Sequence, residues 1–270
     1  MRAFTKVLIK ICGGAIVLGI LLVIIGFSSG AADDIDWRKD FANNENLYDF
    51  NEDYSDVKSI DIDLQYGEVQ IKKGDTFRIE GYNLWKDRFK SEVKDGVWKI
   101  SDEGFKGTNH WSFRVWPLNF GYHSDYTPDI TIYVPQDFKA YEFSLQMDAG
   151  SVEIESLTAI LRTKMSVGAG EIIVNELDAI NADIKCGAGK IELAGNITGD
   201  VNVDCNVGKV ELNLDGKESD YDYEVECNLG SVSINDKDYE FSTSINRDSD
   251  SAVNKLDLIC NVGEIVVNTN

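Results

Sequence analysis

The chain has 270 residues, 43% of them apolar, which is enough for one domain with a continuous core. Residues 1–30 hold three basic residues and no acidic one, so the remainder has 23 basic residues against 47 acidic ones, a net charge of −24. A surface this acidic repels phosphate backbones, which argues against a nucleic-acid partner.

The N-terminal region contains a long uncharged apolar segment. Residues 11–27, ICGGAIVLGILLVIIGF, follow Arg2, Lys6 and Lys10 and precede an acidic stretch. With its apolar neighbours the segment approaches the roughly 20 residues that span a bilayer. The flanking charges predict a single-pass cell-membrane protein with a cytoplasmic N-terminus and an extracytoplasmic body. We therefore predict that residues 1–30 form a cytoplasmic flank and a transmembrane helix. The alternative is a cleavable signal peptide, since Ser29-Gly30-Ala31 resembles a cleavage site.

The rest of the chain divides into a linker and a strand-rich body. Residues 31–56 are acidic and polar, as expected of a linker between membrane and body. The body, 57–270, opens with alternating apolar residues, and VKDGVWKI at 93–100 predicts a hairpin around Asp95-Gly96.

Two insertions interrupt the body, at 103–128 and 235–255. The first insertion is rich in aromatic residues, namely Trp111, Phe113, Trp116, Phe120, Tyr122 and Tyr126. Such rings stack on sugars or anchor protein interfaces, so they are candidates for binding a cell-wall glycan or a membrane protein partner. The alternative is that they cap the open end of the repeats.

The body contains a glycine-anchored repeat. The anchors are Gly67, Gly150, Gly170, Gly189, Gly208, Gly230 and Gly263. Apolar residues alternate on both sides of each anchor, and the spacing of the anchors from Gly150 to Gly208 is nearly constant. Alternation predicts strands, and a period of roughly 20 residues predicts a solenoid. We therefore expect an all-β, β-solenoid-like stack, in which each coil joins two short strands at a glycine turn and lies on the preceding coil.

One inward position of this repeat is rich in cysteine. It lies three residues before the glycine, and its occupants are Met147, Val167, Cys186, Cys205, Cys227 and Cys260. The apolar occupants indicate a packing role for the thiols. Stacked strands lie about 4.8 Å apart, wider than the roughly 3.5–4.5 Å between the Cβ atoms of a disulfide. Because Cys-x-x-Cys spacing and nearby histidines are absent, we predict no metal site here.

A family resemblance rests on ITIYVPQDF at 130–138 and on the repeats LQMDAGSVEIESLTAILRTKMSVGAGEIIVNEL that follow. These segments resemble the bacterial putative-adhesin family of short repeated β-strands, a domain-of-unknown-function family. The resemblance covers roughly residues 57–270 and is strongest at 129–214. It implies a right-handed β-helix-like fold, extracytoplasmic exposure and a membrane tether, and it supplies no catalytic motif. The ladder cysteines and the aromatic insertion depart from the family pattern.

Catalytic signals are weak in this sequence. There is no Gly-x-Ser-x-Gly and no His-Glu-x-x-His, and both histidines, His110 and His123, fall in the first insertion. We therefore predict no catalytic residue, no metal and no cofactor. The sequence favours a membrane-anchored, adhesin-like binding module of the bacterial envelope. The alternatives are an envelope-stress sensor that binds a membrane signalling partner, and a structural envelope protein.

Overall fold

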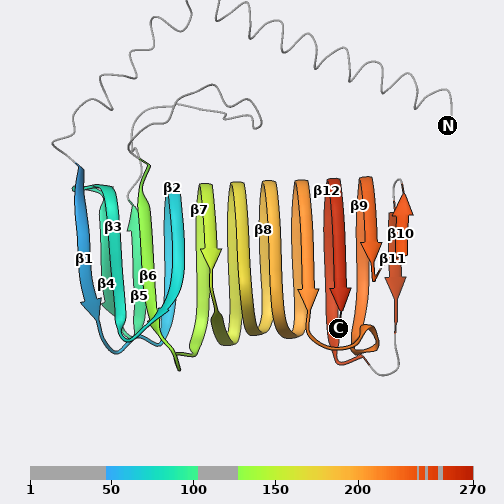
Figure 1. Cartoon of the computed structure of the whole chain (residues 1–270), viewed down its shortest axis with the longest axis horizontal. Coiled ribbons are helices and arrows are strands. Elements are labelled where there is room, and N and C mark those ends of the chain that lie inside the picture. Colours follow the sequence, from blue (N-terminus) through green and yellow to red (C-terminus); the bar gives the residue numbers. More distant parts are fainter. Residues whose placement is uncertain (1–46, 103–126, 236, 241–242, 249–251, 270) are drawn as a thin grey trace, which may run out of the picture. The chain divides into compact units, whose positions relative to one another are not determined.

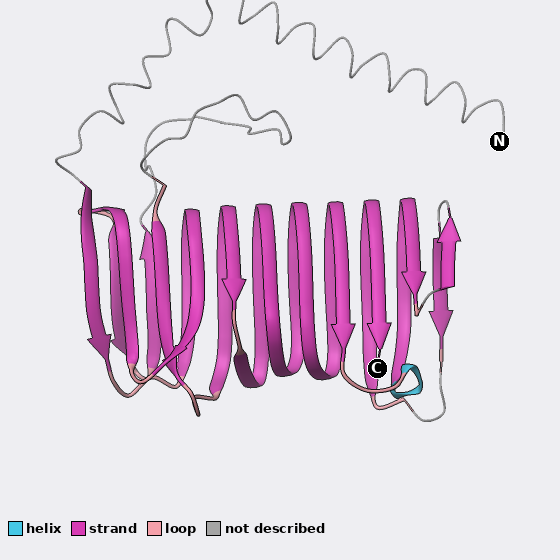
Figure 2. Cartoon of the chain, in the orientation of Figure 1, coloured by secondary structure: helices cyan, strands magenta, loops and turns pink. Residues whose placement is uncertain are grey.

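The computed structural model describes residues 47–102, 127–235, 237–240, 243–248 and 252–269 (Figure 1). They belong to one compact unit, Leu47–Asn270, and almost all of them are in strands (Figure 2). The predicted transmembrane helix lies outside the described residues. Within the described part, no helix is long and apolar enough to cross a membrane.

The strands form a single twelve-stranded sheet. In chain order they are β1 (Leu47–Tyr54), β2 (Ser59–Gly74), β3 (Phe77–Trp85), β4 (Phe89–Lys94), β5 (Val97–Asp102), β6 (Asp129–Pro135), β7 (Ala140–Ile154), β8 (Leu157–Leu214), β9 (Tyr221–Ile234), β10 (Lys237–Glu240), β11 (Thr243–Arg247) and β12 (Asn254–Thr269), with a 3₁₀ turn, η2 (Glu218–Asp220), before β9. Strand β8 is continuous through three coils, so the prediction of an all-β repeat protein is confirmed (Figure 1).

The coils stack in parallel with their glycines in register. Gly67 of β2 pairs with Gly150 of β7, and Gly150 pairs with Gly170 of β8. The same register places Gly263 of β12 beside Gly208 of β8. The early, isolated copy of the repeat around Gly67 therefore belongs to the same stack as the later copies, although β3 to β6 and the first insertion separate it from them in the chain.

The core is a set of apolar ladders that run through the coils. Residues two places after the glycines are buried in every later coil, and they are Val152, Ile172, Ile191, Val210, Val232 and Ile265. Alternation brings every second side chain of a strand to the inside, so each coil contributes one rung to each ladder. Since a single coil cannot bury these side chains by itself, removal of apolar surface from water stabilises the stack as a whole.

The order of the last two coils differs from the prediction that each coil lies on the preceding one. Strand β12 lies between β8 and β9, and it pairs in parallel with both. Cys260 of β12 accordingly faces Cys205 on one side and Cys227 on the other. The cause is the second insertion, which gives the chain enough length to leave β9 and return to the gap between β9 and β8.

The second insertion also covers the far edge of β9. It contains β10 and β11, which pair antiparallel with β9 at Lys237↔Ile234 and Ile245↔Val225. An uncovered terminal coil would present unpaired backbone groups to other chains. Strands β10 and β11, which lie in the segment expected as an interruption, therefore cover one end of the stack.

The other end begins earlier than predicted. Residues 47–54 were expected in the linker 31–56, but they form β1, which pairs antiparallel with β3. The physical reason is aromatic packing, because Tyr48, Phe50 and Tyr54 lie partly buried against the core. The linker prediction is therefore wrong for this part of its range.

The hairpin predicted around Asp95-Gly96 is confirmed. Lys94 pairs with Val97 in the antiparallel pair β4–β5, and Asp95 and Gly96 have φ angles of 54° and 80°. Two successive positive φ angles are typical of the type I′ turns that join twisted strands.

Candidate functional site

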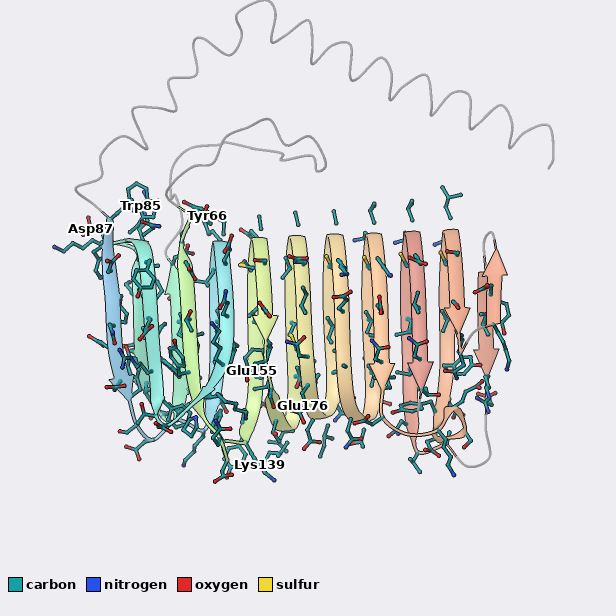
Figure 3. All side chains as sticks on the ribbon, viewed as in Figure 1. Tyr66, Trp85, Asp87, Lys139, Glu155 and Glu176 are labelled. Atoms are coloured by element: carbon teal, nitrogen blue, oxygen red, sulfur yellow. The ribbon has the colours of Figure 1, made fainter. Side chains whose placement is uncertain are left out.

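The seven turn glycines lie along one edge of the stack, which we call the glycine edge. In stacking order they are Gly67, Gly150, Gly170, Gly189, Gly208, Gly263 and Gly230, and their φ angles lie between 141° and 156°. The residue before each later glycine is exposed, so small apolar side chains project from this edge (Figure 3). We call these residues the tip row: Ala149, Ala169, Ala188, Val207, Val262 and Leu229.

Asparagine side chains beside the tip row connect neighbouring coils. Asn228 Nδ2 donates to Asn261 Oδ1 at 2.7 Å, and Asn261 Nδ2 donates to Asn206 Oδ1 at 2.9 Å. Each of these residues stands one place before a member of the tip row. Such asparagine ladders hold equivalent positions of stacked strands in line.

One coil of the stack is divided by the first insertion. Strands β5 and β6 pair with the two halves of β2, at Asp63↔Ser101 and Glu68↔Asp129. Together β5 and β6 therefore correspond to one coil, and residues 103–126 occupy the place in the chain where β2 has its glycine turn. The chain leaves the described body at Asp102 and returns at Thr127, both at the glycine edge.

The six predicted aromatic binding residues, Trp111 to Tyr126, lie outside the described residues, as do both histidines. The described residues at the base of the insertion form a shallow hollow. Tyr66, Trp85, Arg88 and Asp102 are among the residues that line it. The cavity volume is about 20 Å³, enough for a water molecule and little more. This hollow by itself therefore does not enclose a small-molecule site.

Among the residues that line this hollow, Asp102 has a carboxyl group whose pKa is raised above its ordinary value. Its Oδ1 atom accepts a hydrogen bond from the backbone N–H of Gln65 at 2.9 Å. Burial raises the pKa of Asp102, and the nearby carboxylates of Asp63 and Asp148 raise it further. The hydrogen bond from Gln65 and the charge of Arg88 lower the pKa in part.

Aromatic rings border the hollow on the glycine edge. The guanidinium of Arg88 lies 5.1 Å from the centroid of the Trp85 ring, a cation–π contact across the turn between β3 and β4. Trp85, Asp87 and Tyr66 all lie toward this edge (Figure 3).

Sequence reasoning did not single out Tyr66, Trp85 or Asp102. A signal was present for Tyr66, because it occupies the tip position directly before Gly67. The other two could not be found in this way, because Trp85 lies in an antiparallel strand outside the repeat. Asp102 comes to the edge only through the pairing of β5 with β2.

The six residues of the predicted inward ladder are all buried, from Met147 to Cys260. In stacking order its cysteines are Cys186, Cys205, Cys260 and Cys227, and each is a free thiol. The thiols of Cys186, Cys260 and Cys227 each lie 3.7 Å from the carbonyl oxygen of a turn glycine in the neighbouring coil. They therefore act as weak donors between coils.

Contacts between the thiols change their acidity. A hydrogen bond with Cys186 raises the pKa of Cys205 to about 12, and the same contact lowers the pKa of Cys186. A hydrogen bond with Cys205, together with burial, raises the pKa of Cys260. Most of the ladder is thus held in the neutral thiol form, which is a poor nucleophile and a poor metal ligand.

Outside the core, charges pair across the flank of the stack. Lys209 Nζ lies 3.0 Å from Glu211 and 3.6 Å from Glu264 of the neighbouring coil. Over the described ranges, no group of three or more histidine, cysteine or acidic side chains is placed to hold a metal ion. The flank is therefore best described as a solvated, ion-paired surface.

These features define a class of protein, namely a short-coil β-repeat body with an exposed apolar edge. Residues 45–268 match the Toastrack DUF4097 family, and the chain belongs to this family. This is the domain-of-unknown-function family that the sequence resemblance indicated.

Several solved structures are similar to this chain. A putative cell adhesion protein from Clostridium sporogenes is 17% identical, with 83% of this chain and 100% of that chain covered and a TM-score of 0.46. A putative adhesin from Bacteroides fragilis is 16% identical, with coverages of 82% and 96% and a TM-score of 0.36. A putative lipid binding protein from Parabacteroides distasonis is 15% identical, with coverages of 84% and 98% and a TM-score of 0.31. A comparison with curated proteins found no match.

Proposed function

We propose that the protein is a membrane-anchored, extracytoplasmic binding module of the bacterial cell envelope, adhesin-like and non-enzymatic. The observation that carries this proposal is the convergence at the glycine edge. Both ends of the aromatic insertion, the rings of Tyr66 and Trp85, and the tip row all belong to this one edge. A rigid stack that presents aromatic groups on one edge suits binding better than catalysis.

The anchor in this proposal is the apolar segment 11–27, with the N-terminus in the cytoplasm. The first strand begins at Leu47, so the linker is the segment 31–46. Sixteen residues reach at most about 55 Å when fully extended. So short a tether favours ligands close to the membrane, such as cell-wall glycan or another membrane protein.

Photo-crosslinking in cells tests the proposal. Crosslinking residues would replace Trp111 and Tyr122 in the full-length chain, and a control would carry the crosslinker at Tyr141. Tyr141 is 49% exposed, and it follows closely after Lys139, which lies at the opposite edge (Figure 3). We expect capture of a wall glycan or surface polymer at Trp111 and Tyr122, and none at Tyr141.

Other outcomes decide between the alternatives. Capture of one membrane signalling protein at the insertion would support the envelope-sensor function over the adhesin-like function. If neither position captures anything, or if all three positions capture the same material, the insertion is not the binding element and the proposal fails.

A further inference from the structure

We propose that the C-terminal half of the tip row docks on the lipid bilayer, with Val207, Val262 and Leu229 inserted among the headgroups of the membrane that holds the N-terminal segment. This inference rests on the membrane anchor of the proposed function. It adds a defined orientation, in which the glycine edge faces the membrane.

The three side chains form one continuous exposed patch. Val262 is aligned with Val207 on one side and with Leu229 on the other. Their exposed fractions are 51% for Val207, 42% for Val262 and 61% for Leu229. Because the asparagine ladder ties these three coils together at the neighbouring position, the three apolar groups project as a unit. An exposed apolar patch of this kind marks a surface for a partner or a membrane.

The position at which the N-terminal linker joins the body supports the membrane as the partner of this patch. Leu47, the first residue of β1, pairs with Trp85 of β3. Tyr82, also in β3, pairs with Asp129 of β6. Asp129 in turn pairs with Glu68, next to Gly67. The N-terminal segment is therefore joined to the body at the glycine edge, as the start of β1 shows (Figure 1).

Two aromatic residues extend the apolar character of this edge toward the tether. Tyr66 occupies the tip position of its own coil, and Trp85 lies beside the first residue of β1 (Figure 3). Tyrosine and tryptophan are the residues that prefer the headgroup level of a bilayer. Apolar tips at one end of the edge would thus insert among the headgroups. The aromatic rings at the other end would lie at the headgroup level, within reach of ligands at the membrane surface.

The negative charge of the body disfavours binding to anionic lipids. The net charge of −24 that the segment 31–270 carries opposes approach to an anionic surface. Lys209, which directly follows the turn glycine Gly208, is already paired with Glu211 and Glu264. Docking must therefore come from insertion of apolar side chains, and a zwitterionic bilayer is the appropriate probe.

The opposite side of the stack offers a matched control. Leu161 and Ile180 each lie nine residues before a turn glycine, and they are 56% and 45% exposed. They are as apolar and as accessible as the tips. Because neighbouring turn glycines are 19 or 20 residues apart here, a position nine residues from its glycine lies about half a coil away from the glycine edge. Lys139, Glu155 and Glu176 lie at the edge opposite the glycine edge (Figure 3). Unspecific lipid contact would affect both sets equally.

The test uses the full chain in phosphatidylcholine vesicles. A benzophenone amino acid would replace Val207, Leu229, Leu161 or Ile180, one at a time. Flotation would report whether the chain is in the membrane, and mass spectrometry after irradiation would report adducts with acyl chains. We expect every variant to float, and lipid adducts to be several-fold more abundant at Val207 and Leu229 than at Leu161 and Ile180.

Each contrary result has a distinct meaning. If the variants float but lipid adducts are no more abundant at Val207 and Leu229 than at Leu161 and Ile180, the proposed docking of the glycine edge is wrong. The proposal of a membrane-anchored binding module is not affected by that result. A crosslinked dimer at Leu229 in place of lipid adducts overturns lipid docking in favour of a second copy on this edge. Failure to float overturns the anchor, and the docking edge with it.

Discussion

At the turn glycines, a hydrogen atom is the only side chain that the stack admits. A Cβ atom on Gly189 would overlap the carbonyl oxygen of Gly170 in the neighbouring coil, and the φ angle of Gly189 is 145°. We therefore expect Gly189→Ala to lower the free energy of unfolding by about 3 kcal/mol, through strain and displaced backbone. Urea denaturation would measure the change. The control is Ala188→Ser at the adjacent exposed tip, and equal losses in both variants would contradict the close approach of the coils.

Thr163 is a polar residue in an apolar ladder. It is fully buried, and its hydroxyl has no hydrogen-bond partner among the described residues. Replacement by valine keeps the shape and removes the unsatisfied group, so we expect Thr163→Val to raise the free energy of unfolding by about 1 kcal/mol. Thr163→Ser keeps the hydroxyl and removes a methyl group, and it should destabilise the protein. Thermal unfolding of the two variants would show opposite shifts, and a loss of stability in both would contradict the assignment.

Asp102 makes the stability of the body depend on pH in an unusual direction. Its pKa is raised in the folded state, so the folded protein holds the proton more tightly than the unfolded chain. The ionised carboxylate therefore costs stability above the folded pKa, and this cost disappears below the unfolded pKa of about 3.9. We expect Asp102→Asn to be more stable than the wild type at pH 7, with the difference vanishing as the pH falls to that value. Denaturation curves of both proteins across this pH range would test the expectation, and a constant difference would contradict it.

At the scale of elements, the cysteine ladder ties the core of neighbouring coils together. The four ladder thiols are buried, and the pKa of Cys205 is raised to about 12. Because all four thiols are buried out of reach of a reagent in solution, we expect Cys186, Cys205, Cys227 and Cys260 to resist alkylation until the body unfolds. Mass spectrometry after a pulse of iodoacetamide, in buffer and in denaturant, would measure this. Rapid labelling of any of the four in buffer would show that its coil opens or is misplaced.

The coil and its register could be predicted because both are local properties of the sequence. The alternation around Gly150, Gly170 and Gly189 determines which side chains face inward, and the structure has these glycines in register. The position of β12 could not be predicted in this way, because the repeat pattern is the same whichever coil lies next to it. Strand β1 was not predicted, because its aromatic residues lie among acidic ones and the segment therefore resembles an acidic linker. The hollow around Asp102 was missed because it depends on the pairing of distant strands.

At the scale of the whole body, the inserted position of β12 leads to a prediction about truncation. A chain that stops before Asn254 loses an interior coil, because β9 is held to the stack through β12. We expect amides of 221–234 in such a chain to exchange hydrogen at nearly unprotected rates, while β7 and β8 remain protected. Hydrogen-exchange mass spectrometry against the full chain would measure the difference. Continued protection of 221–234 would mean that β9 can stack directly on β8.

The same inserted coil has a consequence for how the protein is made. The ribosome synthesises β9 before β12, so β9 waits with its apolar face uncovered while the following segments emerge. The earlier coils can be added one by one during translation, but this last step requires β12 to enter between two surfaces. During that interval β10 and β11 can already pair with one edge of β9 and limit its contact with other nascent chains. Completion of the stack is thus a late, non-sequential event, and the nascent chain is most prone to aggregation just before it.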